Sequence, residues 1–365
     1  MQYFCLVYFH QKCGSVEDKN KLMSTKPSKS QGKRLVTIFG GGGYIGPIVA
    51  RRLLNSGYMV RVVDLFLYGS QNVMLGLMDA PGFEVLNGDH ANPNTVKKAL
   101  MGATDVVILS GLVGDPITKK YPGVHRAVND VGISRLIDLL DGQKLQRVIF
   151  VSTCSNYGFI RENQVADENF ELKPLSLYAK AKVKAEKKLL ALNGKANYDV
   201  VILRFATAFG LAPRMRFDLT ISQFVREMAL KNKLLVYDPD TWRPYCHVQD
   251  FAAVIHNALE APNRAIKFEV FNAGGEANNY TKRMIVETIL KFIPDAPIAY
   301  QDHGPDPRNY RVDFTKIRET LNFEPTYTIE DGIQELFSAL KENLFPDIEH
   351  RLNFYGNYQV KYPVS

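Results

Sequence analysis

Residues 35–46 read LVTIFGGGGYIG, and this stretch decides the fold of the chain. A short apolar run precedes four consecutive glycines, and the amphipathic segment IVARRLLNSG follows from residue 48. A strand, a glycine turn and a helix in this order place backbone amides where they can bind a phosphate at the helix N-terminus. Gly40, Gly43 and Gly46 lack a Cβ atom and so allow a close approach. The stretch therefore predicts a dinucleotide-binding turn rather than an ordinary loop.

Two carboxylates follow at the ends of the next predicted strands. Asp64 lies 18 residues after Gly46, where a carboxylate accepts hydrogen bonds from the adenosine ribose 2′-hydroxyl and repels a 2′-phosphate. This position favours NAD over NADP, with a strand-end turn aspartate as the alternative. Asp89 and His90 close the third predicted strand. We expect Asp89 to reach the adenine amino group or, alternatively, to cap a loop.

Short β-branched runs alternate with longer segments of helical period from residue 34 onward. The predicted strands are 35–39, 59–64, 83–87, 105–109, 147–152 and 200–205. The predicted helices are 45–56, 94–101, 122–140, 175–192, 218–230, 249–260, 281–292 and 329–342. The alternation predicts an α/β fold class, a Rossmann-type doubly wound parallel sheet with helices on both faces.

Gly and Pro breaks loosen this rhythm after residue 205, which predicts a smaller, mostly helical C-terminal substrate lobe. We divide the chain into a disordered basic leader (1–33), an NAD-binding domain (34–205, with parts of 240–275 returning to it), a substrate lobe (206–345) and an aromatic tail (346–365).

Three residues at the ends of predicted strands and on a helix form a candidate hydride-transfer site. Tyr178 and Lys182 lie one helical turn apart, so that both side chains share a face. A nearby ammonium lowers the pKa of a tyrosine, which could then exchange a proton with an alcohol, and Lys182 could also hold the nicotinamide ribose. Thr153 supplies a hydroxyl for the reacting oxygen. Alone, the Tyr-Lys pair is better explained as a solvated helix face; the glycine turn upstream favours catalysis.

These residues resemble the extended short-chain dehydrogenase/reductase family, and within it the nucleotide-sugar epimerases, dehydratases and reductases. The family's GxxGxxG loop matches the three spaced glycines, its Ser/Thr ahead of a Tyr-Gly matches Thr153 before Tyr157, and its YxxxK pair matches Tyr178 and Lys182. The resemblance covers about residues 34 to 340. It implies NAD as cofactor, a nucleotide-diphosphate sugar as substrate, a role in carbohydrate biosynthesis, and a homodimer formed through the helices 122–140 and 175–192.

The motifs and the resemblance together give an expected set of contacts. The expected cofactor contacts are Gly40, Gly43, Tyr44, Ile45, Gly46, Asp64, Asp89, His90, Ser110, Gly111, Leu112, Asn129, Ser152, Tyr178, Lys182 and Phe205. The expected substrate contacts are Val113, Cys154, Ser155, Asn156, Thr207, Arg214, Arg216, Phe217, Arg243, Tyr245 and Arg308. Arg243 and Arg308 are expected to grip the substrate pyrophosphate, because a planar guanidinium binds phosphate through two hydrogen bonds; each could instead be a surface charge.

Departures from the family pattern narrow the expected reaction. Family 4,6-dehydratases carry Asp-Glu directly after the catalytic Thr, whereas this chain has Cys154 and Ser155. A neutral hydroxyl cannot replace a glutamate base, so dehydration is disfavoured. A usual Asn is Thr207, which puts one phosphate hydrogen bond in doubt.

Oxidation or reduction at one sugar carbon, most often C4, remains. The chain is then a 4-epimerase or a C4 dehydrogenase, and Asp64 fits an NADPH-dependent keto-sugar reductase less well. The alternative of another class is a non-catalytic dinucleotide sensor or RNA-binding relative, against which the intact relay of Thr153, Tyr178 and Lys182 argues.

Composition limits the partners and the compartment. The 365 residues carry a formal net charge of +7, but residues 1–34 hold +5 of it, so we predict no nucleic-acid partner. Apolar runs far shorter than the roughly 20 residues of a membrane span predict no membrane association. Four scattered cysteines fit neither a disulfide framework nor a zinc site, which indicates a reducing cytoplasm and no metal.

The two ends of the chain carry less information. The first dozen residues lack the basic start and the small-residue cleavage site of a signal peptide, and Met23 is a candidate translation start. The tail holds Phe354, Tyr355, Tyr358 and Tyr362, and we expect it to pack on the second lobe or across a dimer.

Overall fold

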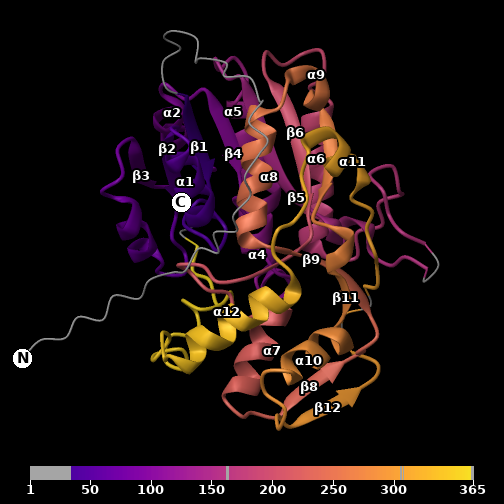
Figure 1. Cartoon of the computed structure of the whole chain (residues 1–365). Coiled ribbons are helices and arrows are strands. Elements are labelled where there is room, and N and C mark those ends of the chain that lie inside the picture. The colour runs from indigo at the N-terminus through magenta and orange to yellow at the C-terminus, as the bar shows by residue number, and fades with distance from the viewer. Residues whose placement is uncertain (1–33, 162–163, 305, 307, 363–365) are drawn as a thin grey trace, which may run out of the picture. The chain divides into compact units, whose positions relative to one another are not determined.

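Seven parallel strands form the central sheet, in the order β10-β6-β5-β4-β1-β2-β3 (Figure 1). The computed structural model describes residues 34–161, 164–304, 306 and 308–362, so the predicted leader 1–33 lies outside the described residues. The strands are β1 (Leu35–Phe39), β2 (Met59–Asp64), β3 (Phe83–Asn87), β4 (Asp105–Ile108), β5 (Arg147–Thr153), β6 (Asp199–Phe205) and β10 (Glu269–Ala273). The first six agree with the predicted strands to within one residue at each end.

Helices cover both faces of this sheet, and others lie in the smaller lobe described below. They are α1 (Gly46–Asn55), α2 (Pro93–Leu100), α3 (Asp115–Lys120), α4 (Pro122–His125), α5 (Ile133–Leu139), α6 (Leu177–Leu190), α7 (Thr220–Ala229), α8 (Val248–Glu260), α9 (Asn263–Ile266), α10 (Lys282–Leu290), α11 (Thr315–Leu321) and α12 (Ile329–Lys341). Seven of the eight predicted helices agree to within two residues. The predicted helix 122–140 is divided, because a π-helical stretch, Arg126–Gly132, separates α4 from α5.

Both faces of the sheet are apolar, which is why its central strands read as continuous hydrophobic runs. In β1, Val36 and Ile38 belong to the cluster that contains the buried residues of α1 and α8. Phe39 belongs to the opposite cluster, formed with α2, α5 and α6, and Thr37 donates a hydrogen bond to the carbonyl of Ala99 in α2. This arrangement confirms the predicted doubly wound α/β fold.

The order of the strands creates a switch point beside β1. This strand pairs in parallel with β2 on one side and with β4 on the other. The loops that leave β1 and β4 therefore run to opposite sides, and the crevice between them is where open α/β sheets bind ligands.

The rest of the chain builds a smaller lobe that contains strands the sequence did not indicate. One small sheet combines β7 (Thr207–Phe209), β9 (Trp242–His247) and β11 (Asn279–Thr281), and another pairs β8 (Leu234–Tyr237) with β12 (Ile298–Gln301). The helices α7, α10 and α12 lie with them (Figure 1). Strands of three to six residues are too short to show a clear period in the sequence. The division of the chain at residue 205 stays a prediction.

Candidate active site

A cavity of about 570 Å³ opens at the carboxyl ends of the central strands, with the smaller lobe as its opposite wall. The expected contact residues that line it are Gly40, Gly43, Tyr44, Ile45, Gly46, Asp64, His90, Ser110, Gly111, Val113, Ser152, Thr153, Ser155, Tyr178, Lys182, Phe205, Thr207, Arg214, Arg216, Arg243, Tyr245 and Arg308. Segments far apart in the sequence thus meet around one hollow, at the place where this fold binds ligands. The roles of these residues stay predictions.

The glycine turn is shaped by contacts that leave no room for side chains. Gly40 has a φ of +81°, and a Cβ atom there would lie 2.5 Å from the Cα of Ser110. A Cβ atom on Gly46 would overlap the carbonyl of Gly41, whereas one on Gly43 would meet only ordinary contacts. The first and third glycines are therefore needed for the packing of the turn, and Gly43 leaves its backbone open to the cavity.

Asp64 is held in place by this turn. One carboxylate oxygen accepts a hydrogen bond from the amide of Gly42 at 2.8 Å, and the other accepts one from the amide of Phe66 at 2.7 Å. Burial raises the pKa of Asp64, and the two amide hydrogen bonds oppose that rise. Each oxygen keeps a further lone pair, so the carboxylate can still accept hydrogen bonds from two ribose hydroxyls.

Asp89 does not face the cavity, although His90 beside it does. The carboxylate of Asp89 accepts hydrogen bonds from the amide of Ala91 at 2.8 Å and from the hydroxyl of Tyr362 at 2.5 Å. The loop-capping alternative therefore describes Asp89 in this structure better than an adenine contact. Burial lowers the pKa of His90, so its ring is neutral at pH 7.

Tyr178 and Lys182 share a helix face, as their spacing predicts. The Nζ atom of Lys182 lies 5.8 Å from the centre of the Tyr178 ring and donates a hydrogen bond to the carbonyl of Val151 at 2.7 Å. Burial lowers the pKa of Lys182 to about 8. Burial also raises the pKa of Tyr178, and the negative charge of Asp115 raises it further. Burial therefore acts against the expected lowering of the tyrosine pKa by Lys182, which stays a prediction.

Thr153 ends β5 and lies on the same wall. Its Oγ1 accepts a hydrogen bond from the amide of Ser155 at 3.1 Å, which caps the short 3-10 helix that follows. The hydroxyl proton of Thr153 is not needed for that contact. It can therefore point into the cavity and donate to an oxygen there.

Cys154 and Asn156 turn away from the cavity, and this corrects their expected role as substrate contacts. The thiol of Cys154 donates to the carbonyl of Arg204 at 3.1 Å. The amide of Asn156 donates to Glu186 at 2.8 Å, and the same carboxylate forms an ion pair with Arg204 at 2.8 Å. In the 3-10 helix that follows β5, Ser155 lines the cavity, whereas Cys154 and Asn156 contact residues behind its wall.

Three further expected contacts also lie behind the wall. Asn129 exchanges two hydrogen bonds with the backbone of Leu112, accepting from its amide at 2.6 Å and donating to its carbonyl at 2.9 Å. Leu112 is buried in an apolar cluster with α3. Phe217 packs against the rings of Phe345 and Tyr355. These residues shape the cavity without facing it.

Arg243 and Arg308 meet at a shared carboxylate. Asp306 lies 3.2 Å from a guanidinium nitrogen of Arg243 and 2.7 Å from one of Arg308. The pKa of Asp306 is lowered, because the two arginines outweigh the effect of its burial. Arg308 also contacts Asp115 at 3.0 Å and donates to the hydroxyl of Ser155 at 3.2 Å. Two guanidinium groups thus converge on one carboxylate, and a guanidinium can also bind a phosphate through two hydrogen bonds.

Arg214 and Arg216 are both buried and already partnered. Arg216 forms an ion pair with Asp218 at 2.6 Å. Arg214 lies 4.5 Å from the ring centre of Tyr68 and donates to the side chain of Asn357 at 2.9 Å. Burial and the nearby charge of Arg216 lower the pKa of Arg214 to about 10. Their main partners are protein groups, although both still border the cavity.

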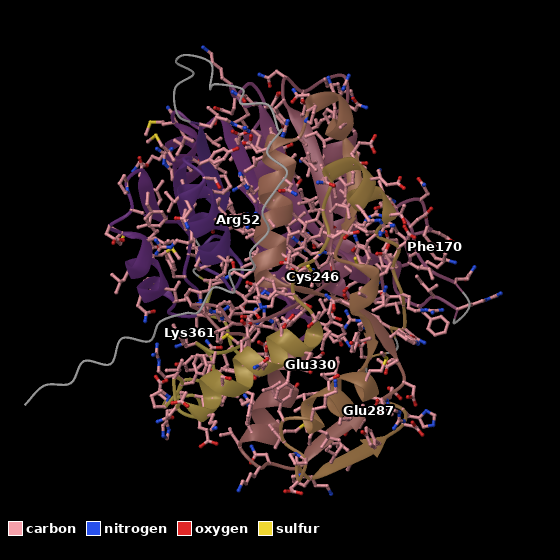
Figure 2. The ribbon with its side chains drawn as sticks, viewed as in Figure 1. Arg52, Phe170, Cys246, Glu287, Glu330 and Lys361 are labelled. Carbon is pink, nitrogen blue, oxygen red and sulfur yellow. The ribbon has the colours of Figure 1, made fainter. Side chains whose placement is uncertain are left out.

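The end of the chain contributes a wall that the sequence did not indicate. Residues 354–362, here called the C-terminal strap, cross from the small lobe to the large sheet; Lys361 marks the strap in Figure 2. Asn357 donates to the carbonyl of Val113 at 2.9 Å, and Val360 joins the apolar cluster of α3. Asn357 and Tyr358 line the cavity. The expected packing of the tail on the second lobe is thus only part of its contacts.

Other lining residues escaped the sequence analysis because no motif marks them. Those that bear on the chemistry of the site include Asp115, Lys282, Asp306 and Tyr310. Asp306 lies two residues before Arg308, and that proximity was the one available signal.

Among the described residues, no group of three or more His, Cys, Asp or Glu side chains could hold a metal ion. No described helix combines the length and apolar character needed to cross a membrane.

Comparison with known proteins places these motifs in context. Residues 36–274 match the family described as NAD dependent epimerase/dehydratase family. UDP-glucuronic acid decarboxylase 2 of Arabidopsis thaliana is 26% identical over 328 residues, which cover 87% of this chain and 71% of that protein. UDP-glucuronate 4-epimerase of Thermodesulfobacterium geofontis is 26% identical over 327 residues, which cover 86% and 97%.

Solved structures share the fold. The UDP-glucuronic acid 4-epimerase from Bacillus cereus, in complex with UDP-glucuronic acid and NAD, matches with a TM-score of 0.77 at 24% identity, over 84% of this chain and 99% of that one. The UDP-glucose 4-epimerase of Thermus thermophilus, in complex with NAD, matches with a TM-score of 0.74 at 20% identity, over 85% and 99%.

Proposed function

The chain belongs to the NAD-dependent epimerase/dehydratase family, and on this basis we propose that it oxidises C4 of a nucleotide-diphosphate sugar with NAD, as a 4-epimerase or a C4 dehydrogenase. One observation carries the proposal. Tyr178, Lys182 and Thr153 line the cavity into which the glycine turn opens. A relay for an alcohol proton and a turn for a dinucleotide phosphate therefore border the same space.

The residues present fit NAD. A Cβ atom on Gly43 would meet only an ordinary contact, whereas one on Gly40 would collide with Leu109 and Ser110 just after β4. The oriented carboxylate of Asp64 suits a free ribose 2′-hydroxyl and opposes a 2′-phosphate. When bound, NAD supplies the acceptor for the hydride that leaves C4.

The relay residues move and hold the proton of the C4 oxygen. Tyr178 takes this proton during oxidation and returns it during reduction. Burial favours the protonated phenol, which suits the return step. Oxidation requires the phenolate, which an ammonium as near as that of Lys182 would favour. Thr153 donates its free hydroxyl proton to the same oxygen. The ammonium of Lys182 donates one of its three hydrogen bonds to the carbonyl of Val151. Its two other N–H groups can donate to a ribose hydroxyl.

The remainder of the cavity suits the nucleotide diphosphate. Arg243 and Arg308 converge on Asp306, where a diphosphate would replace the carboxylate as their partner. Lys282 adds a third cation to this wall. The 4,6-dehydratase reaction stays disfavoured, because Cys154 is buried and Ser155 is neutral at the two positions after Thr153.

The test is incubation of the purified protein with NAD and a panel of nucleotide sugars, followed by NADH absorbance and product mass. A mixture of C4 epimers without net NADH identifies an epimerase, and a keto-sugar with stoichiometric NADH identifies a dehydrogenase. Absence of turnover on every sugar, with NAD binding intact, would contradict the proposal and favour the non-catalytic sensor.

A matched variant locates the chemistry. Tyr178→Phe removes only the phenolic oxygen, so we expect a loss of at least about a hundredfold in turnover with unchanged NAD affinity. Tyr237→Phe is the control, because Tyr237 is exposed on β8 and does not line the cavity. Full activity of the Tyr178→Phe protein would show that another group carries the proton.

A further inference from the structure

Asp115 has a carboxylate oxygen without a partner at the reacting end of the cavity. Its Oδ2 pairs with Arg308 at 3.0 Å, but its Oδ1 is buried and has no hydrogen-bond partner among the described residues. A buried carboxylate oxygen that lacks a donor is costly, and such groups are normally paired. A donor is therefore missing at this position.

The surroundings of Asp115 connect it to the proton relay. Arg308 joins Asp115 to the hydroxyl of Ser155, and that hydroxyl also lies 3.3 Å from the hydroxyl of Tyr310. The amide of Ser155 binds Thr153, and the charge of Asp115 acts on Tyr178. Asp115 thus belongs to the part of the cavity that would surround the reacting sugar.

From this geometry we propose that Asp115 is a sugar-recognition residue, whose free oxygen accepts a hydrogen bond from a hydroxyl of the sugar. The inference rests on the proposed function, because it takes the relay end of the cavity as the sugar site. A charged acceptor strengthens such a bond and makes it selective, since an analogue that lacks the donor leaves the carboxylate unpaired.

The same carboxylate sets the charge of the preferred sugar. Asp115 and Asp306 together balance Arg308 and Arg243, so the two arginines next to the sugar place bring no surplus positive charge to it. A sugar carboxylate facing Asp115 would meet a like charge at low dielectric. We therefore expect a neutral hexose to be preferred to a uronic acid, although several relatives are named for UDP-glucuronic acid.

The test separates the sugar from the nucleotide. UDP, dTDP, GDP, CDP and ADP are first titrated calorimetrically into the NAD-loaded protein, and the glucose and glucuronic acid derivatives of the base that binds are then compared. We expect Asp115→Ala to weaken the glucose derivative about 10- to 100-fold and to change the affinity for the free nucleoside diphosphate less than about twofold.

Two further variants guard the interpretation. Asp115→Asn keeps the shape of the side chain and one acceptor oxygen, so it should lose less affinity for the glucose derivative than Asp115→Ala does. Because it removes the negative charge, it should also reduce the difference in affinity between the glucose and the glucuronic acid derivatives. Lys119→Gln changes one charge on the exposed side of the same helix and serves as the control. Unchanged NAD affinity in all variants reports an intact fold.

Each contrary outcome has a distinct meaning. Equal weakening of the free diphosphate and of the glucose derivative would mean that Asp115 acts only by holding Arg308, and an unaffected glucose derivative would mean that water fills the position. A wild-type preference for the glucuronic acid derivative would also overturn the inference. If none of the five diphosphates binds, the proposed function itself fails.

Discussion

At the scale of single residues, the burial of Lys182 makes stability depend on pH. Burial lowers its pKa from 10.5 to about 8, so between these values the unfolded chain binds more protons than the folded protein. Burial of the Lys182 ammonium therefore lowers the free energy of unfolding by its full amount below about pH 8. This loss of stability disappears as the pH rises towards 10.5. A shift of this size corresponds to about 3 kcal/mol at pH 7.

The corresponding prediction concerns Lys182→Met. We expect this variant to gain stability over the wild type at pH 7, and the gain to be about 2 kcal/mol smaller at pH 9.5. Urea denaturation at both pH values measures the difference. A gain that does not change with pH would mean that the ammonium is not buried as described.

Glu186 lies behind the cavity wall, where it contacts Asn156 and Arg204. It is 2% exposed and pairs with Arg204, which also donates to the hydroxyl of Tyr157 at 3.0 Å. Glu186→Gln leaves the guanidinium buried without a counter-charge, so we expect the free energy of unfolding to fall by about 3 kcal/mol. Glu171→Gln, at an exposed ion pair with Lys173, should change it by less than about 1 kcal/mol. Similar losses in both variants would contradict the role of burial.

At the scale of elements, the sequence was informative where an element is long or apolar on both faces. The strands β1, β2 and β3 were predicted at their observed bounds, because β-branched runs end at glycine or polar turns. The strands β7 and β11 have three residues each, and their pairing with β9 depends on contacts distant in sequence. The π-helical stretch that interrupts the predicted helix 122–140 likewise has no local signal.

The C-terminal strap is an element with a testable role. It lines the cavity through Asn357 and Tyr358 and is anchored to the loop after β3 by Tyr362. We expect deletion of residues 357–365 to weaken NAD binding about tenfold or more and to speed its release, because the deletion opens the wall and frees Asp89. Fluorescence titration and stopped-flow release of NADH measure both effects.

A point substitution serves as control for this deletion. Lys361 is exposed on the strap and lies outside the lining residues, so Lys361→Ala should bind NAD as the wild type does. Unchanged NAD affinity after the deletion would show that the strap covers the cavity without retaining the cofactor.

At the scale of the whole molecule, the candidate site was predictable only where local motifs mark it. The glycine turn, Thr153, Tyr178 and Lys182 stand in recognisable order along the chain, and all line the cavity. Asp115 and Lys282 line the cavity because the fold brings distant segments of the chain together. No pattern in a single sequence predicts that contact. Cys154 was wrongly expected to contact the substrate, because being next to Thr153 in the sequence does not make its side chain point into the cavity.

The predicted homodimer can be examined through charge. The exposed sides of α6 and of the helices before it carry Lys180, Lys184, Lys187, Arg126 and Arg135. A dimer through these helices would bring many like charges together, so salt should favour it by screening. We expect light scattering to give a mass nearer to twice 41.2 kDa in 0.5 M NaCl than in 0.05 M. A dimer that weakens as salt is added would exclude this interface.

The shared carboxylate of Asp306 has a consequence for the binding of the proposed nucleotide-diphosphate sugar. Because Arg243 and Arg308 already have an anion between them, arrival of a diphosphate exchanges one counter-ion for another. The diphosphate would then displace the carboxylate of Asp306 from the two arginines. Its affinity would depend on how much more strongly the arginines bind the diphosphate than they bind Asp306. On the proposed function, an internal anion of this kind would favour ligands with enough negative charge to displace it from the two arginines.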